Sequence, residues 1–199
     1  MRRSVVFTMI AWSLSIVIIL SFSCIFSPDT GKKTPKPPLQ WEEPTTPRQV
    51  IENLEMSFNQ LDIDFYERCL HENFFYRSPS DVDEFDIYWN RSNEIEVMRK
   101  MFPACREFIF TPNEIRIYEE YGKNVENKPD GAIIDSEDLH PDDIWIVCDY
   151  YITMDIFFTE MGDYKVQQDM KFKMVENLET HLYSIIRWVD ETQFAQKAA

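Results

Sequence analysis

Glycine and histidine are scarce in this chain of 199 residues, and each shortage limits what the protein can be. With 4 glycines and 15% aromatic residues, the composition favours a compact, aromatic-packed domain over one dominated by loops. The 3 histidines are scattered, and no group of cysteines has the spacing of a metal site. We therefore expect neither a metal nor a cofactor.

Basic residues are also in short supply beyond the N-terminus. Residues 41–199 carry 15 Lys or Arg and 34 Asp or Glu, a formal net charge of −19. Such a surface repels phosphate backbones and anionic lipid head groups. We expect no nucleic-acid partner.

What the chain does have, at its N-terminus, is a long uncharged run. Arg2 and Arg3 precede the uncharged residues 4–28, which is the order of an export signal. About 20 apolar residues suffice to cross a bilayer, so an uncleaved single-pass span is the alternative. Residues 1–24 are thus predicted to be a signal or lipoprotein leader, or else a membrane anchor.

Cys24 closes the segment Leu20-Ser21-Phe22-Ser23-Cys24, which resembles a bacterial lipobox, although Ser21 stands where leucine is usual. Acylation of such a cysteine anchors a protein, because each buried methylene adds about 0.8 kcal/mol of membrane affinity. We predict lipidation at Cys24 and a domain tethered outside the cytoplasm, in the cell envelope. Cys69, Cys105 and Cys148 are then an odd number that cannot all pair, so we expect small buried hydrophobes.

Residues 27–47 hold six of the 11 prolines and show no apolar periodicity. This composition predicts an extended, semi-rigid spacer, and a ligand for a proline-binding module is the alternative. We divide the chain into the leader at 1–24, a tether at 25–45, one domain at 46–191 and a tail at 192–199. About 150 residues are enough for a single core.

Helical signals come first in the domain. Thr46-Pro47-Arg48-Gln49 offers a capping threonine, a proline at the first helical place and a glutamine that closes a capping box. Apolar residues at helical spacing continue this helix to Leu61. We expect a second helix at about 64–70, a short strand at 74–76, and a third helix that is capped by Ser92 and ends near Pro103.

Beyond Pro103 the apolar residues alternate, which predicts strands at about 105–111, 114–119, 144–157, 164–175 and 181–190. In the strand at 144–157, every second residue from Ile144 to Ile156 is apolar or Tyr, while Asp149 and Asp155 lie on the other face. A sheet with one buried and one wetter face, and with helices on the buried side, predicts an α+β fold.

Residues 119–143 are acidic and weakly apolar, and we expect an exposed loop or insertion there. Its carboxylates are suited to calcium, although the order of an EF-hand is absent. The alternative to a solvated loop is therefore a calcium site formed by Asp135, Glu137, Asp138, Asp142 and Asp143.

The order of these elements resembles the nuclear-transport-factor-2-like superfamily, which includes SnoaL-like cyclases and ketosteroid isomerases. TPRQVIENLEMSFNQLDIDFYERCLHENFFYRSP resembles its opening helical hairpin and first strand, NRSNEIEVMRKMF its third helix, and HLYSIIRWVD its closing strand. The resemblance covers about residues 46–191. It implies a cone, in which a curved antiparallel sheet wraps over three N-terminal helices and a pocket opens between them.

Members of this superfamily use the pocket for catalysis, for binding or only as a scaffold, so the fold leaves function open. Isomerase-type chemistry would need a carboxylate base and an oxyanion donor in a dry pocket. We identify no base and hence no catalytic residue. The pocket-lining candidates are Tyr150 and Gln168 in the apolar register, with Tyr66 and Trp89 near the mouth.

Two further features carry alternatives. His71 follows the second helix, where it either acts as an acid or base or complements the helix dipole. The outer strand face would present a partly apolar surface that suggests a homodimer, formed by Trp145, Val147, Tyr151 and Phe157.

Our main hypothesis is a membrane-anchored, extracytoplasmic, non-enzymatic domain that binds a partner protein or a small apolar ligand in its cone. The alternative is a SnoaL-like isomerase, cyclase or dehydratase that acts by proton transfer. A purely structural dimeric module would instead have its pocket filled by Met and Phe side chains.

Overall fold

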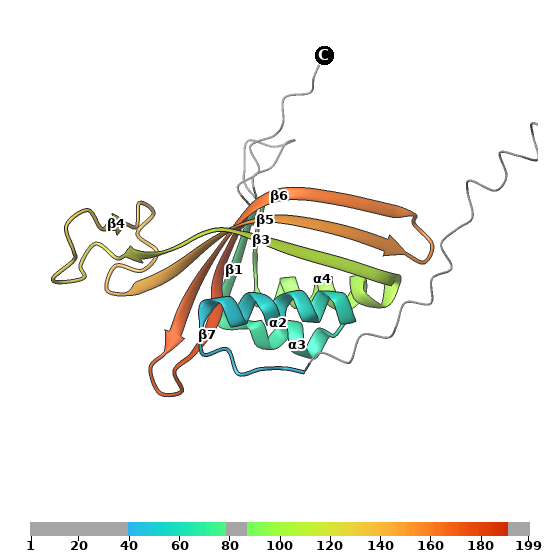
Figure 1. The fold of residues 1–199 in the computed structure, drawn as a ribbon, viewed down its shortest axis with the longest axis horizontal. Helices are drawn as coiled ribbons and strands as arrows, with labels where there is room; N and C mark the ends of the chain where they lie inside the picture. The colour runs from blue at the N-terminus through green and yellow to red at the C-terminus, as the bar shows by residue number, and fades with distance from the viewer. Residues whose placement is uncertain (1–39, 79–86, 191–199) are drawn as a thin grey trace, which may run out of the picture. The chain divides into compact units, whose positions relative to one another are not determined.

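The computed structural model describes residues 40–78 and 87–190 (Figure 1). The predicted leader with Cys24, the tether up to residue 39 and the tail at 192–199 lie outside the described residues. Among the helices that are described, none combines the length and apolarity needed to cross a membrane. The elements run in the order α2 (Pro47–Gln60), α3 (Ile63–Cys69), β1 (Leu70–Ser78), β2 (Ile87–Asn90), α4 (Arg91–Ala104), β3 (Cys105–Tyr121), β4 (Ile133–Ile134), β5 (Ile144–Phe158), β6 (Asp163–Asn177) and β7 (Leu182–Asp190).

The strands form one sheet in the order β2-β1-β7-β6-β5-β3-β4. The helices gather on one side of this sheet, which bends over them, so the predicted α+β fold is confirmed (Figure 1). The sheet is mixed, whereas we expected an antiparallel one: β1 pairs with β7 and β3 with β4 in parallel, and the remaining pairs are antiparallel. No tight turn joins β1 to β7, so the chain is free to bring them together in the same direction.

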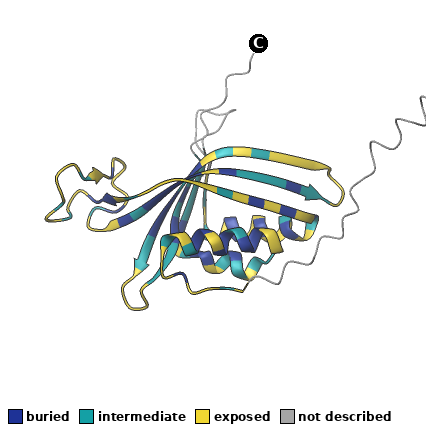
Figure 2. Ribbon diagram, in the orientation of Figure 1, coloured by how far each residue is buried: buried dark blue, intermediate teal, exposed yellow. Residues whose placement is uncertain are grey.

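The core lies between the helices and the concave face of the sheet, where buried residues concentrate (Figure 2). Phe58 of α2 is its centre, with ring centroids of Phe102, Phe108, Phe110 and Trp188 between 4.7 and 6.5 Å away. Burying one such side chain contributes about 1.5–3 kcal/mol. The thiols of the predicted small hydrophobes are indeed buried and free: Cys69, Cys105 and Cys148.

The caps of the helices are set by side chains. Thr46 accepts a hydrogen bond from the Gln49 backbone N–H at 3.2 Å, so the predicted start of the first helix is confirmed. The third helix begins at Arg91, because the Asn90 side chain accepts from the Asn93 N–H at 3.1 Å. Asn90 therefore takes the capping role that we assigned to Ser92.

Residues 40–45, which we name the N-terminal strap, pack on the domain and are not a free part of the tether. The Asn53 side chain exchanges two hydrogen bonds with the Glu42 backbone, at 2.7 and 3.4 Å. The Tyr183 N–H donates to the Pro44 carbonyl at 2.8 Å. The Arg68 guanidinium lies 4.0 Å from the centroid of the Trp41 ring. Residues 40–45 therefore belong to the same compact unit as the helices and the sheet.

β3 is one long strand where the sequence suggested two. A register shift between Glu114 and Arg116 marks an irregularity of the kind a β-bulge produces, and pairing with β5 continues on both sides of it. Pro112 is tolerated because, among the described residues, β3 pairs on its other side only with β4, at residues 120–121.

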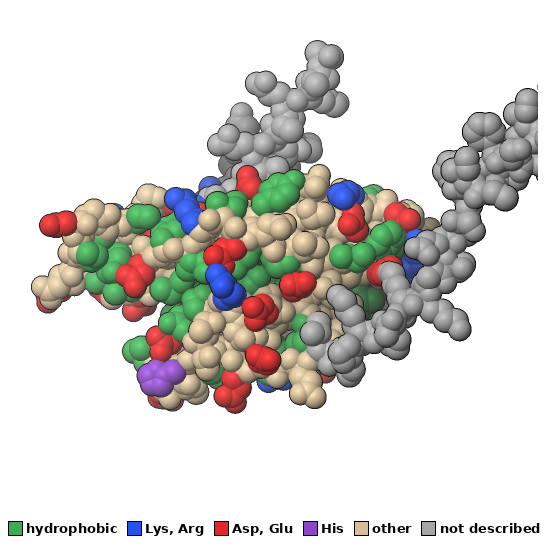
Figure 3. Space-filling view, in the orientation of Figure 1, with side chains coloured by type: hydrophobic (Ala, Val, Ile, Leu, Met, Phe, Trp, Pro, Cys, Tyr) green, Lys and Arg blue, Asp and Glu red, His purple; other side chains and the backbone are tan. Residues whose placement is uncertain are grey.

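The outer face of the sheet differs from the expected apolar surface. Trp145 and Val147 are only 2% and 0% exposed, and the His140 ring of the segment 122–143 stacks on Trp145, whereas Tyr151 is 39% exposed. On the face shown in Figure 3, acidic side chains are scattered among apolar ones and basic side chains are fewer. The homodimer remains a prediction, but Trp145 and Val147 do not form an open surface for it.

Candidate functional site

A buried carboxylate lies on the concave side of the sheet. Glu94 of α4 is 6% exposed, and the hydroxyl of Tyr66, which is fully buried on α3, donates a hydrogen bond to its Oε1. Glu94 precedes Met98 by four residues and Phe102 by eight, so all three lie on the helix face that packs on the core. A carboxylate is thus held in mainly aromatic surroundings.

The surroundings change the acidity of these groups. Burial raises the pKa of Glu94 above its usual value, and the Tyr66 hydroxyl and the nearby Trp89 indole oppose this only in part. Burial and the adjacent Glu94 charge raise the pKa of Tyr66 well above its usual value. A carboxyl group whose pKa moves toward neutrality is suited to both taking and returning a proton.

Side chains from β1, β2 and β7 continue this site. The rings of Tyr76 and Trp89 stack with centroids 5.0 Å apart, and the edge of Trp188 approaches Tyr76 at 6.0 Å. The Ser78 hydroxyl donates to Asp190 Oδ2 at 3.0 Å. Burial raises the pKa of Tyr76 to about 12, with the charges of Asp190 and Glu94 adding to the shift. We name this group the cone cluster: Tyr66, Tyr76, Ser78, Trp89, Glu94 and Asp190.

Trp89 contributes a polar group that needs a partner. Its Nε1 is buried and makes no hydrogen bond of normal geometry with the residues that the structure describes. An indole N–H can only donate, so it calls for an acceptor. The cone cluster therefore places a buried indole N–H beside a buried carboxylate.

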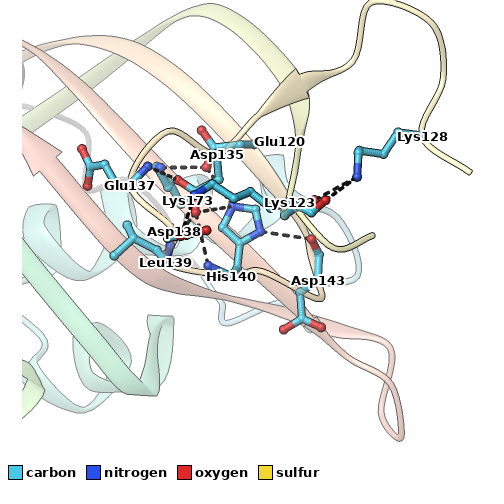
Figure 4. Close-up of polar contacts among 11 residues, drawn as sticks. Glu120, Lys123, Lys128, Asp135, Glu137, Asp138, Leu139, His140, Asp143 and Lys173 are labelled. Atoms are coloured by element: carbon cyan, nitrogen blue, oxygen red, sulfur yellow. Dashed lines mark hydrogen bonds and ion pairs between the residues drawn. The ribbon is translucent and has the colours of Figure 1, made fainter. Parts of the chain in front are cut away.

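A second buried polar cluster lies between the outer face of the sheet and the segment 122–143 (Figure 4). Asp135 and His140 belong to that segment, and Glu120 and Lys173 belong to β3 and β6. Glu120 Oε1 accepts a hydrogen bond from Lys173 Nζ at 2.7 Å and lies 2.9 Å from His140 Nε2. Asp135 accepts from the backbone N–H groups of Glu137, Leu139 and His140. We name Glu120, Asp135, His140 and Lys173 the loop cluster.

Comparison with known proteins agrees with this architecture. No family model and no curated protein matches the chain. A conserved protein from Planctomyces limnophilus matches with a TM-score of 0.52 at 6% identity, over 71% of this chain and 89% of that one. A candidate aromatic ring hydroxylase from Novosphingobium aromaticivorans matches with a TM-score of 0.51 at 9% identity, over 74% and 87%. The chain has the nuclear-transport-factor-2-like fold.

A ketosteroid isomerase-like protein from Erwinia carotovora atroseptica also matches, with a TM-score of 0.48 at 9% identity, over 73% of this chain and 93% of that one. At identities this low, the activity of the domain has to be argued from its own residues.

The nuclear-transport-factor-2-like fold brings two of the four pocket-lining candidates together, because Tyr66 and Trp89 both lie beside Glu94. Tyr150 lies elsewhere: its hydroxyl donates to Glu114 at 3.3 Å, beside a cavity of about 320 Å³ between α2 and β3. Gln168 is half-buried on β6 and lines a hollow of about 910 Å³ whose lining includes many charged side chains.

Glu94 was missed by the sequence analysis, although a signal was present. It shares the apolar stripe of its helix with Met98 and Met101, at i, i+4 and i+7. A glutamate in the first turn of a helix is ordinarily explained by the helix dipole, which hides this signal.

His71 stands apart from the cone cluster in its contacts. It lies half-buried at the start of β1, and its Nδ1 accepts the Asn73 backbone N–H at 3.1 Å. Burial lowers the pKa of His71, with Arg187 and Arg91 acting in the same direction against Glu72. The His71 Nδ1 is therefore engaged by the backbone two residues further along β1.

The suggested calcium ligands do not converge in the nuclear-transport-factor-2-like domain. Glu137 pairs with Arg77, Asp138 with Lys123, and Asp142 with Asn124. A different set, Glu120, Asp135 and His140, brings its ligand atoms within 4.8 Å of one another. However, Glu120 already accepts a hydrogen bond from the Lys173 ammonium, and Asp135 accepts hydrogen bonds from three backbone N–H groups. Both carboxylates are therefore engaged within the protein.

Proposed function

We propose that this domain is a proton-transfer enzyme in which Glu94 is the acid–base group. The observation that carries the proposal is the state of Glu94: a carboxylate, 6% exposed, with a raised pKa and a fixed hydrogen bond to Tyr66. Burying a carboxylate without a cation costs stability, and sites that accept this cost are often functional.

The chemistry would be abstraction of a proton from a carbon next to a carbonyl group. The C–H bond breaks, the proton passes to Glu94, and the electron pair moves toward the carbonyl oxygen as an enolate forms. Donors aimed at that oxygen stabilise the developing charge, and the Trp89 Nε1–H and the Tyr76 hydroxyl are the donors beside Glu94 that would serve. Glu94 then returns the proton to another carbon, which completes an isomerisation.

Aromatic walls favour a small, largely apolar substrate. Trp89 and Tyr76 lie near the carboxylate, and Trp188 packs against Tyr76. We propose a small cyclic carbonyl compound as the substrate class, because a flat apolar ring stacks well on such side chains.

We also propose that the enzyme works outside the cytoplasm, attached to the cell envelope through Cys24. The export-type leader, the lipobox resemblance and the proline-rich tether support this part of the proposal.

A non-catalytic binding domain is the second candidate, and a specific observation favours it. Phe172 and Met170 on the concave face of β6, and Phe58 of α2 in the core against that face, are 0–3% exposed. Side chains that fill the interior of the cone leave less space for a substrate, as expected for a domain that serves only as a scaffold.

The test compares Glu94→Gln with Glu96→Gln, which lies on the exposed side of the same helix and pairs with Lys100. Both variants and the wild type are incubated in D₂O with a panel of small cyclic β,γ-unsaturated ketones, and deuterium incorporation is followed by NMR. We expect Glu94→Gln to slow exchange by about 10²–10⁴-fold and Glu96→Gln to leave it unchanged. Binding of these ketones by the wild type without any exchange would favour the second candidate.

A further inference from the structure

Arg187 of β7 is a cation without a carboxylate partner on the outer face of the sheet. It lies next to Phe75 of β1 and Lys173 of β6 in the strand register. Arg77 and Arg116 each form an ion pair with a carboxylate, but no acidic side chain among the described residues pairs with Arg187. In a domain whose acidic side chains far outnumber its basic ones, an arginine without a counter-charge is unexpected.

The strand register makes the charge of Arg187 unfavourable. Lys173 stands directly opposite Arg187 in the β6–β7 pair, and like charges at opposite positions destabilise a sheet. Glu120 accepts a hydrogen bond from Lys173 Nζ at 2.7 Å and so supplies the anion for that residue. No described carboxylate does the same for Arg187. The outer face therefore carries one compensated and one uncompensated cation on neighbouring strands.

Other contacts fix the position of the Arg187 guanidinium without neutralising it. The centroids of the Phe75 and Trp145 rings lie 5.6 and 5.4 Å from its central carbon. Its Nη1 donates to the carbonyl oxygens of Asn73 and Ile186 at 2.9 and 2.7 Å. The side chain is half-buried, and burial lowers the pKa of Arg187. A cation that loses water and gains no counter-charge costs stability, and an anion bound beside it would reduce that cost.

Several N–H groups of this guanidinium remain without an acceptor. Arginine has five N–H donors, and the two bonds of Nη1 use two of them. Nε is buried and has no hydrogen-bond partner in the part of the chain that the structure describes. Nη2 has no partner there either, and it is not among the buried atoms of this kind. An acceptor from outside the domain can therefore reach the Nη2 group.

His71 places a second donor near Arg187. Asn73 joins the two residues, because its carbonyl oxygen accepts from Arg187 and its N–H donates to His71 Nδ1 at 3.1 Å. Since Nδ1 accepts, the proton of the neutral ring is carried by Nε2. Burial lowers the pKa of His71, and the nearby charge of Arg187 lowers it as well, which favours this neutral form. The His71 Nε2–H is thus a neutral donor close to a guanidinium.

We propose that Arg187, assisted by His71, binds an oxyanion, the carboxylate or phosphate group of a small ligand, on the outer face of the sheet. The oxyanion would accept hydrogen bonds from Arg187 Nη2 and His71 Nε2 and would supply the missing counter-charge. Hydrogen bonds between a guanidinium and an oxyanion are charge-assisted and about twice as strong as neutral ones. The site lies on the opposite side of the sheet from the cone cluster, so it does not depend on the proposed proton transfer.

Titration of the full chain with anions tests this site. Sodium phosphate or sodium acetate replaces sodium chloride at a constant ionic strength of about 0.15 M, which keeps general screening unchanged. NMR follows the side-chain ¹⁵N resonances of Arg187 and His71. We expect saturable shifts at both residues with at least one of the two anions, and the anion that saturates at the lower concentration identifies the class of ligand. Arg187→Met should bind that anion at least about tenfold more weakly, the loss expected for one charge-assisted hydrogen bond.

Arg68→Met is the matched control and should leave anion binding unchanged. Arg68 also lies over an aromatic ring, that of Trp41 at 4.0 Å, and forms no ion pair with a described residue. Where Arg187→Met does not fold, Arg187→Lys replaces it: this variant keeps a cation but lacks the Nη2 group, and we expect weaker binding of the same anion. Wild-type shifts that rise linearly with anion concentration would indicate an adventitious contact only and would overturn the proposal. Unchanged affinity in Arg187→Met or Arg187→Lys would also overturn it and would leave Arg187 a structural role between β1 and β7.

Discussion

The pKa values of Glu94 and Glu120, two buried glutamates of this domain, shift in opposite directions. Glu94 in the cone cluster is 6% exposed and Glu120 in the loop cluster is 7% exposed, so burial alone penalises both. Glu94 is bonded to a neutral phenol, and its pKa is raised. Glu120 is bonded to an ammonium and an imidazole, and its pKa is lowered. The charge of the partner, more than the depth of burial, decides the direction.

Under our proposal Glu94 exchanges a proton, whereas Glu120 stabilises structure in its ionised form. Protonation of Glu94 breaks no ion pair, because its partner, the Tyr66 hydroxyl, carries no charge. Glu120 holds Lys173 and His140 in place by staying ionised. Glu94 of α4, on the concave side of the sheet, and Glu120 of β3, on its outer face, therefore differ in the charge state that their partners favour.

The largest effect is expected from removing the cation beside Glu120. Lys173→Met leaves a buried carboxylate without its ammonium partner and should lower the free energy of unfolding by about 3–5 kcal/mol. Urea unfolding measures the change. Lys165→Met is the control, because the exposed Lys165 pairs with Asp155 at 3.5 Å and such a pair contributes under about 1 kcal/mol. Equal effects from the two variants would contradict the assigned role of Lys173.

A smaller effect is expected from preventing the close approach of the loop to β3. Gly122→Ala places a methyl group against the His140 carbonyl and should cost about 1–3 kcal/mol, the usual range for overpacking. Thermal unfolding gives the size of the effect, and hydrogen exchange locates it. Protection should fall at residues 135–147 and stay unchanged in α4, which separates the two clusters; loss of protection in both would contradict a local role.

The smallest effect concerns Glu94 itself and depends on pH. A carboxyl group with a raised folded-state pKa contributes stability below its unfolded value of about 4.5 and loses it as the pH rises through the folded value. The Glu94→Gln side chain does not ionise. The melting temperature of this variant should therefore rise relative to that of the wild type as the pH increases from 4 to 8. Glu96→Gln should show no gain over this range, and a gain equal to that of Glu94→Gln would indicate a general charge effect.

Much of the fold was predictable because it depends on local spacing. Val50, Leu54 and Phe58 recur at helical intervals and are all buried on α2. Alternation in β5 and β6 likewise gave their extent and the buried core residues in the middle of each strand, whereas Ile144 and Tyr164 at the start of each predicted face are exposed. Such patterns need no knowledge of distant partners, and so the helices, β5, β6, β7 and the α+β class could be predicted from them, whereas β3 was predicted as two strands.

The clusters were not predictable, because distant residues form them. Glu120, His140 and Lys173 lie 20 to 53 positions apart. They meet because the register pairs Glu120 with Trp145 and Val147 with Lys173. Nothing near any one of them in the sequence indicates that register. Tyr66 and Glu94 are 28 positions apart and come from two helices. The parallel pairing of β1 and β7 is a similar long-range event.

The N-terminal strap has a mechanical consequence. Its hydrogen bonds run to Asn53 in α2 and to Tyr183 in β7, and its indole is covered by Arg68 of α3. Tension applied through the residues before Gln40 would therefore be shared at once by two helices and a central strand. No single terminal hydrogen bond would have to give way first, so the domain should withstand pulling from this end better than a fold whose first strand can peel away.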